Sequence, residues 1–328
     1  MRHKAMILLA LLGCLLLLTG CSSMLGGGSA MGNMAQNNTP AATETQPPEP
    51  LTVTMPSEPV NTVILRECED LGTEYYLTAL NPWARYLGEP RQINSQGAEA
   101  LVRWLCTQEA RDQLDACRDG MFRSRPEVPV YSGWISPAQN ATKTIQLLAD
   151  TDLVSMGLLE ELLSAFTEAY GYQVEVTEMD SQELFASAAL GEADLLLSRM
   201  PPEDILFENA NYYRQIPGFS ATHVPLCLVP YVLCGPESDP AGAAQAKTME
   251  AALAAIEQAE CYFISRGDGS DVHQAELAIW KDKPQGDWYF EAGTDMGPCL
   301  VIAEEMAGYL LSDRLTYEIF ARENGVIG

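Results

Sequence analysis

Strand-like and helix-like segments alternate from residue 62 to the end of the chain. Short apolar runs predict strands at 62–66, 75–80, 144–149, 172–177, 194–197, 224–233 and 262–264. Periodic or capped runs predict helices at 95–106, 107–118, 156–170, 182–190, 249–258, 271–281, 298–311 and 314–322. This alternation is typical of an α/β protein whose sheets are mostly parallel and flanked by helices. The stretch 62–328 is long enough for two lobes that share one cleft.

The segment before the folded part has the features of an export signal. Two basic residues, Arg2 and Lys4, precede an apolar run over 5–18, which is shorter than the roughly 20 residues that span a bilayer. The next residues, Leu18-Thr19-Gly20-Cys21, resemble the lipobox of bacterial lipoproteins, in which the cysteine is acylated. The alternative is an ordinary signal with a chance cysteine. We predict a signal peptide over 1–20, lipidation at Cys21 and an extracytoplasmic, membrane-anchored protein.

Residues 21–61 separate this anchor from the folded part. They contain Gly26-Gly27-Gly28-Ser29 and Pro47-Pro48-Glu49-Pro50 and almost no periodic apolar residues. Such a composition cannot bury a core, so we predict a disordered tether.

Charge and composition exclude several classes of function. Without residues 1–20 the chain has 17 Lys and Arg against 45 Asp and Glu, a formal charge of −28. This balance argues against nucleic acid or anionic lipid as a partner, although a local pocket can still bind a small anion. The sequence contains no Cys-x-x-Cys pair, Gly-x-Ser-x-Gly or His-Glu-x-x-His motif. We therefore predict no metal site, no cofactor and no enzyme activity.

The seven cysteines beyond Cys21 are irregularly spaced, and most lie in apolar runs. They are interpreted as buried thiols, with a disulfide between some of them left open.

The block Ser265-Arg266-Gly267-Asp268 follows an apolar strand and precedes a helix that starts near Ser270. A helix start offers unpaired backbone N–H groups and a partial positive charge, and Arg266 adds a fixed cation. Gly267 lets the backbone approach a ligand closely. The alternative role for Arg266 is a structural salt bridge with Asp268 or Asp271. The combination of groups suits a small anion.

Several further blocks recur in a characteristic order around this one: Gly157-Leu158-Leu159, Gly191-Glu192-Ala193-Asp194, Asp239-Pro240-Ala241-Gly242 and Ser312-Asp313-Arg314. Together they resemble the tungstate-type branch of the periplasmic substrate-binding proteins of ABC importers. The resemblance implies a two-lobed, type II periplasmic-binding-protein-like fold. It also implies a small oxyanion such as tungstate or molybdate in the interlobe cleft, and a membrane permease as partner of a monomer.

The order of the segments differs from that of the family. Strand, hinge and closing-helix segments that end the family's chains resemble 63–65, 76–82 and 93–105 at the front of this chain. We interpret this as a circular permutation. Lobe A then covers about 76–222, and lobe B covers about 223–328 plus the strand 62–66. The strand 63–65 should join the sheet of the lobe that holds 262–264, and 83–125 should pack on the lobe built from 144–222. The alternative is an unrelated small domain over 62–130.

The resemblance predicts a pocket built by three loops and one arginine. Its residues are Asp150, Thr151, Asp152, Arg199, Ser265, Arg266, Gly267, Ser270, Thr294, Met296 and Gly297. His273 keeps the family position and is interpreted as a capping or supporting group.

Acidic residues intrude at two of these loops. The family carries a run of Thr and Ser where this chain has Thr151 between Asp150 and Asp152, and Asp295 lies in the family's glycine-rich turn. Carboxylates repel an anion unless they face away and cap the helix. Arg199, where the family commonly has His, either adds positive charge to the cleft or pairs with Asp150 or Asp152. The ligand is therefore an oxyanion. The alternative is a ligand sensor without transport, or a degenerate binder, with a changed ligand such as an organic anion or a zwitterion.

Overall fold

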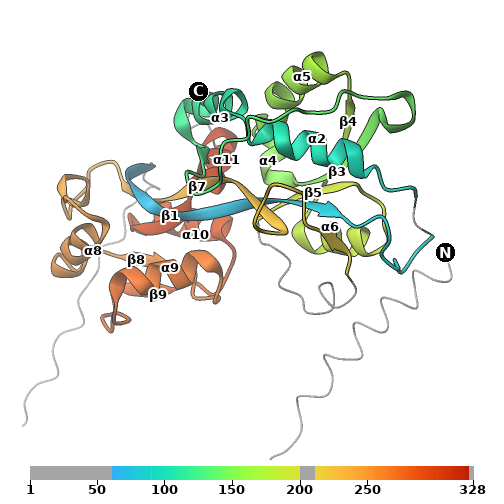
Figure 1. The fold of residues 1–328 in the computed structure, drawn as a ribbon. Helices are drawn as coiled ribbons and strands as arrows, with labels where there is room; N and C mark the ends of the chain where they lie inside the picture. The colour runs from blue at the N-terminus through green and yellow to red at the C-terminus, as the bar shows by residue number, and fades with distance from the viewer. Residues whose placement is uncertain (1–60, 90, 200–210, 325–328) are drawn as a thin grey trace, which may run out of the picture. The chain divides into compact units, whose positions relative to one another are not determined.

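The computed structural model describes residues 61–89, 91–199 and 211–324 (Figure 1). The predicted signal peptide, Cys21 and the tether up to residue 60 lie outside the described residues. Within the described part, none of the helices combines the length and the apolar character needed to cross a bilayer.

The main sheet has eight strands. Its central order is β10 (Leu310–Asp313), β7 (His223–Pro236), β1 (Thr62–Leu80), β5 (Leu195–Ser198), β3 (Thr144–Asp150) and β4 (Gln173–Met179). The short strands β2 (Arg123–Ser124) and β6 (Tyr213–Arg214) pair with β7 and β1. A second sheet pairs β8 (Phe263–Ser265) with β9 (Tyr289–Glu291), and a bridge from Phe263 to Tyr309 brings it close to β10.

The expectation of mostly parallel sheets is wrong. β3 runs parallel to β4 and β5, but β1 is antiparallel to β5, β6 and β7, and β7 is antiparallel to β2 and β10. Helices connect β3, β4 and β5 in succession, as parallel pairing requires. The long strands β1 and β7 pair in antiparallel fashion, and such a pair needs no helical crossover between its strands. The α/β class is confirmed, with a mixed sheet.

The helices are α2 (Ser95–Leu105), α3 (Gln108–Ala116), α4 (Thr151–Ser155), α5 (Leu158–Tyr170), α6 (Ser181–Ala189), α8 (Met249–Gln258), α9 (Asp271–Trp280), α10 (Met296–Met306) and α11 (Arg314–Glu323). Short 3-10 turns lie at Cys117–Gly120, Asn140–Thr142 and Ala243–Gln245. Side-chain caps explain many of the starts: Asn94, Thr107 and Thr248 each accept a hydrogen bond from the backbone N–H three residues later.

Two predicted helices and two predicted strands differ in extent. The helix expected at 156–170 is preceded by a separate short helix, α4, and Gly157, at φ 78°, separates the two. The helix expected at 298–311 ends at Met306, because Ala307 adopts φ 49° and the chain then enters β10. The strands expected at 62–66 and 75–80 are the two halves of β1.

The pairing of β1 with β7 extends from Val63 opposite Gly235 to Thr78 opposite His223. Its register shifts between Glu67 and Gly72, where β1 carries extra residues. Arg123 closes this bulge by donating hydrogen bonds to the carbonyl oxygens of Cys68 (3.1 Å) and Glu69 (2.9 Å). Where the ladder resumes, Gly72 faces Pro230 so closely that a Cβ atom would lie 2.2 Å from the Val229 carbonyl oxygen.

Two large hydrophobic clusters share these two strands. The first contains Tyr75 and Leu77 of β1 together with residues of α2, α3, β3 and α5. The second contains Tyr231 to Cys234 of β7 and residues of α8, α9, α10 and β10, and Ile64 and Leu65 of β1 pack against it. In Figure 1, α8, α9 and α10 accordingly gather at one end of β1, and α2, α5 and α6 at the other. The packing of α2 and α3 in the first cluster agrees with the predicted contact of 83–125 with 144–222, whereas 63–65 pairs with β7 in the main sheet and not with the sheet of β8. The permutation itself stays a prediction.

The buried carboxylate of Asp194 connects the segment before α2 with two strands of the first cluster. Asp194 is fully buried and accepts hydrogen bonds from Arg91 (2.7 and 3.1 Å) and from the backbone N–H groups of Asn94 (2.6 Å) and Gln146 (2.7 Å). The bonds join the segment before α2 to β3 and to the start of β5.

We predict that Gly72→Ala lowers the free energy of unfolding by about 3 kcal/mol, because the new Cβ would overlap the Val229 carbonyl oxygen of the neighbouring strand. Gly297→Ala is the matched control. A Cβ there meets no atom within 4 Å, and alanine favours the helix, so this variant should stay within about 1 kcal/mol of the wild type. Urea denaturation followed by circular dichroism measures both. Equal stability of the two variants would contradict the close approach of β1 and β7.

Candidate ligand-binding site

The loop after β3 is a capped helix start. β3 ends at Asp150, which is almost fully buried, and α4 begins at Thr151. Asp150 Oδ1 accepts a hydrogen bond from the Asp152 N–H (3.1 Å). Asp150 therefore caps α4, which is one of the two alternatives predicted from the sequence. Thr151 is exposed beside it.

Arg199 pairs with both aspartates of this loop. Its Nε donates to Asp150 Oδ2 (3.0 Å), and its Nη2 forms an ion pair with Asp152 Oδ2. Burial raises the pKa of Asp152 above its ordinary value, and the neighbouring charge of Asp150 adds to the rise, while Arg199 opposes both. The paired alternative for Arg199 is the one that the structure shows.

Arg266 is held in the same way by two carboxylates. Its Nε donates to Asp268 Oδ2 (2.9 Å), and its Nη2 lies 3.1 Å from Asp295 Oδ1. Asp268 Oδ1 also accepts from the Ser270 N–H (3.0 Å). Burial raises the pKa of Asp268, but the hydrogen bonds from Ser270 and the charge of Arg266 outweigh it and hold this pKa below its usual value. The salt bridge proposed with Asp268 forms.

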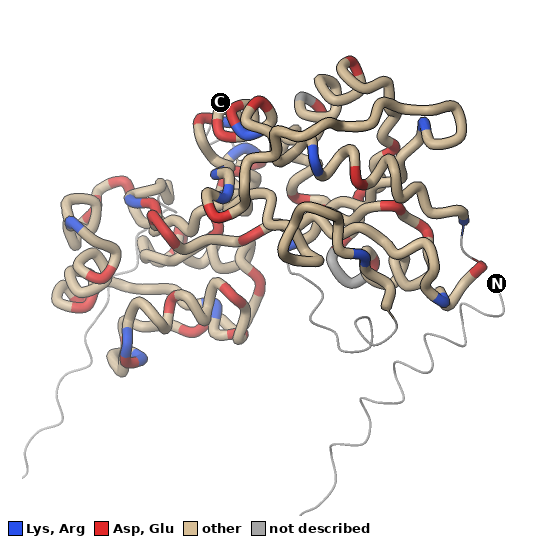
Figure 2. The backbone as a smooth tube through the Cα atoms, in the orientation of Figure 1, with Lys and Arg blue, Asp and Glu red and all other residues tan. Residues whose placement is uncertain are grey.

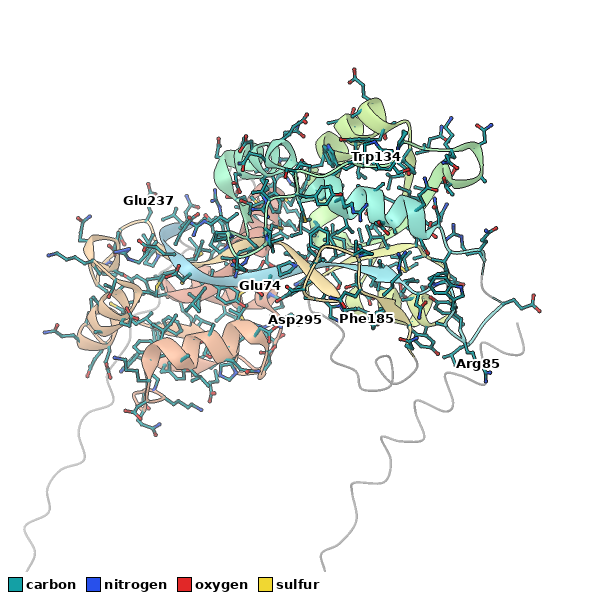
Figure 3. The ribbon with its side chains drawn as sticks, in the orientation of Figure 1. Glu74, Arg85, Trp134, Phe185, Glu237 and Asp295 are labelled. Atoms are coloured by element: carbon teal, nitrogen blue, oxygen red, sulfur yellow. The ribbon has the colours of Figure 1, made fainter. Side chains whose placement is uncertain are left out.

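The turn before α10 contributes the second carboxylate of this group. Asp295 occupies the N-cap position but makes no capping bond, and its side chain is 90% exposed (Figure 3). Met296 is buried in the second cluster, and Gly297 is half-buried. Thr294 is half-buried, and its carbonyl oxygen accepts a weak bond from the Cys299 thiol (3.8 Å).

The glycine and the serine of the Arg266 loop have roles in the backbone structure of the loop. Gly267 adopts φ 64°, which favours glycine, and a Cβ there would lie 2.9 Å from the Glu291 side chain. Ser270 caps α9 by accepting from the His273 N–H (3.4 Å). His273 Nδ1 accepts from the Gly269 N–H (2.9 Å), so this histidine supports the loop.

A buried acid beneath this loop was not predicted. Glu276 on α9 is 2% exposed, and the Tyr289 hydroxyl donates to its Oε1 at 2.6 Å. Burial raises the pKa of Glu276 to about 7, although the hydrogen bond from Tyr289 lowers it in part. Ser265 itself is fully buried. The only feature of the sequence that could have indicated this buried acid is a glutamate on the buried face of a predicted helix.

The structure thus gathers the predicted residues into two groups. We name them by their arginines: the Arg199 group with Asp150 and Asp152, and the Arg266 group with Asp268 and Asp295. Each contains one guanidinium and two carboxylates. Among the described residues, no ion pair joins one group to the other. Figure 2 shows that acidic residues also prevail over basic ones along the tube around both ends of β1.

A comparison with known families identifies the class. The profile described as the PBP superfamily domain matches residues 136–326, which is more than half of the chain and includes both arginine groups. The chain therefore belongs to the PBP superfamily. Residues 61–135, which contain the whole of β1, α2 and α3, lie outside the match.

Individual relatives point to one branch of this superfamily. The chain is 33% identical over 184 residues to the tungstate-binding protein TupA of Peptoclostridium acidaminophilum, covering 54% of this chain and 61% of that protein. It is 27% identical over 168 residues to TupA of Campylobacter jejuni subsp. jejuni, covering 49% and 58%. The chain thus spans about three fifths of the length of these relatives. The predicted resemblance to tungstate-type binding proteins is confirmed.

A solved structure also matches in part. It is the tungstate ABC transporter protein of Geobacter sulfurreducens, with 31% sequence identity and a TM-score of 0.40, over 55% of this chain and 76% of that one.

The raised pKa of Glu276 makes stability depend on pH. The folded-state pKa of about 7 lies above the unfolded value of about 4.5, so the folded chain holds the proton more tightly. The stabilisation is complete below pH 4.5 and is lost as the pH rises through 7, about 3 kcal/mol in all. Glu276→Gln removes this dependence.

Urea denaturation between pH 4.5 and 8 tests this prediction. The difference in unfolding free energy between wild type and Glu276→Gln should move by about 3 kcal/mol in favour of the variant as the pH rises. Glu237→Gln, at an exposed position, should track the wild type throughout (Figure 3). A pH-independent difference for Glu276→Gln would show that this carboxyl titrates normally.

Proposed function

We propose that the chain is the ligand-capturing component of an ABC importer, anchored through lipidated Cys21 on the extracytoplasmic face of the membrane. The observation that carries this proposal is the superfamily match, which includes both arginine groups. The names of the relatives, which are binding proteins, and the export-type start of the sequence support it. The partner that follows from it is a membrane permease.

In this proposal the two hydrophobic clusters are the cores of two lobes. Lobe A is about 76–222, and lobe B is about 223–328 with the strand 62–66. The division is supported by the change of cluster along β1, from Leu65 in one to Tyr75 in the other. The Arg199 group belongs to the first and the Arg266 group to the second. A ligand that contacts both groups favours the closed arrangement of the lobes.

The permuted order of the chain is part of the same proposal. It is supported by the packing of the early helices in the first cluster and of Ile64 and Leu65 against the second, and by Asp194, which joins the segment before α2 to β3. Termini of compact domains commonly lie close together on the surface, which makes such a rearrangement physically accessible.

The ligand-binding residues that we propose are Asp150, Thr151, Asp152, Arg199, Ser265, Arg266, Gly267, Ser270, Thr294, Met296 and Gly297. The arginines are the groups that hold the anionic part of the ligand, because a guanidinium offers paired donors to planar or tetrahedral oxygens. A second candidate function, a ligand sensor without transport, is favoured by one observation: carboxylates already contact both arginines.

Ligand capture predicts thermal stabilisation. The melting temperature is measured by thermal shift with tungstate, molybdate, sulfate, phosphate and the amino acids as a panel of ligands. At least one member of this panel should raise the melting temperature of the wild type. At a concentration of 100 times Kd the expected gain is about 2.7 kcal/mol. Arg266→Ala should abolish the shift, because it removes the donor of one group.

The control for this prediction is Arg85→Ala, at an exposed arginine outside both groups, which should keep the shift (Figure 3). A wild-type protein that no panel member stabilises, or an Arg266→Ala variant that responds like the wild type, would contradict the proposal.

A further inference from the structure

The four carboxylates around the two arginines fall into two kinds. Asp150 and Asp268 have structural duties, because each accepts a hydrogen bond from a backbone N–H two residues later, at 3.1 and 3.0 Å. Such bonds fix the start of α4 and the turn before α9. These two aspartates are explained without a ligand.

Asp152 and Asp295 have no such duty among the described contacts. Asp295 occupies the N-cap position of α10 without capping it, and its Oδ1 turns to Arg266. Asp152 Oδ2 pairs with Arg199. Each arginine group therefore contains one aspartate that accepts a hydrogen bond from a backbone N–H and one aspartate that forms an ion pair with the guanidinium. The side chain of Asp295 is 90% exposed and that of Asp152 is 28% exposed, so solvent reaches both.

The charges decide what such a site accepts. The two groups together contain two guanidinium groups and four carboxylates, which leaves an excess of two negative charges if all are ionised. A divalent oxyanion would have to displace a carboxylate from its arginine and would be repelled by the others. A cation alone would meet the two arginines. A ligand with both signs of charge can contact a guanidinium with its anionic end and an aspartate with its cationic end.

We propose that this site binds a zwitterion, with an ammonium group at Asp152 or Asp295 and a carboxylate at Arg199 or Arg266, and that it rejects bare oxyanions. The inference rests on the proposed function, since it names the ligand class of the same site.

Calorimetry with matched probes tests the ligand class. Each amino acid is compared with the carboxylic acid that lacks its amino group, with the amine that lacks its carboxylate, and with tungstate. The expected result is that at least one amino acid binds, and that both of its single-charge analogues bind at least about tenfold more weakly. Binding of tungstate to the wild type, equal binding of the carboxylic acid, or no binding of any amino acid overturns the inference.

The double variant Asp152→Asn and Asp295→Asn tests the role of the two aspartates. It removes two charges that carry no recorded capping bond, so the fold should persist, as circular dichroism will show. We expect a loss of amino-acid affinity of at least about tenfold and the appearance of tungstate binding, because the guanidinium groups are released. The double variant Asp282→Asn and Asp287→Asn makes the same charge change at exposed positions beyond the far end of α9 and should leave both properties unchanged.

The outcomes separate the inference from the function it rests on. If the wild type binds tungstate, the protein is a solute-binding protein and the inference is wrong. If neither the wild type nor the Asp152→Asn and Asp295→Asn variant binds any probe, both the inference and the proposed function fail. If the variant folds but gains no tungstate binding, the carboxylates do not exclude the oxyanion, and the inference is overturned.

Discussion

The antiparallel pairing of β1 with β7 is the constraint on which the rest of the structure depends. The two strands take part in both large hydrophobic clusters, so neither core is complete without them. The register of the pairing shifts at three places, and at the longest of them, between Glu67 and Gly72, Arg123 bonds to the bulged backbone. Glu67 also pairs with Arg123 and with Arg314 of α11. The bulge of β1 between the two clusters is therefore held by polar contacts as well as by the strand pairing.

This arrangement gives the site its form. The loop after β3 and the end of β5 present the Arg199 group, and the loops before α9 and α10 present the Arg266 group. Each group has the same composition of one guanidinium and two carboxylates. Helix starts favour anions, but carboxylates of the chain itself already use the cationic side chains there. The superfamily scaffold and the cargo are thus separable properties. In the function that we propose, the scaffold is set by the strands and cores, and the ligand is selected by a few aspartates.

The sequence predicted most local elements because their signals are local. α8 begins after the Thr248 cap, and α9 begins after the Ser270 cap, as expected. The continuity of β1 was missed because residues 67–74 are polar and contain a glycine, which reads as a turn, whereas contacts with Pro230 and Arg123 keep this segment in the sheet. Strand direction and the burial of Glu276 also depend on partners distant in the sequence. For the site, the sequence predicted two alternatives each for Arg199 and Asp150, and the structure was needed to decide between them.

The central claim is that one ligand engages both arginine groups, and hydrogen exchange followed by mass spectrometry tests it most directly. The protein is compared with and without the amino acid that gives the largest thermal shift. The account predicts that amides in 151–156 and in 266–273 gain protection together, while the β1–β7 ladder is slow to exchange in both states. Protection confined to one of the two loops would contradict the account, since the ligand would then belong to one group alone.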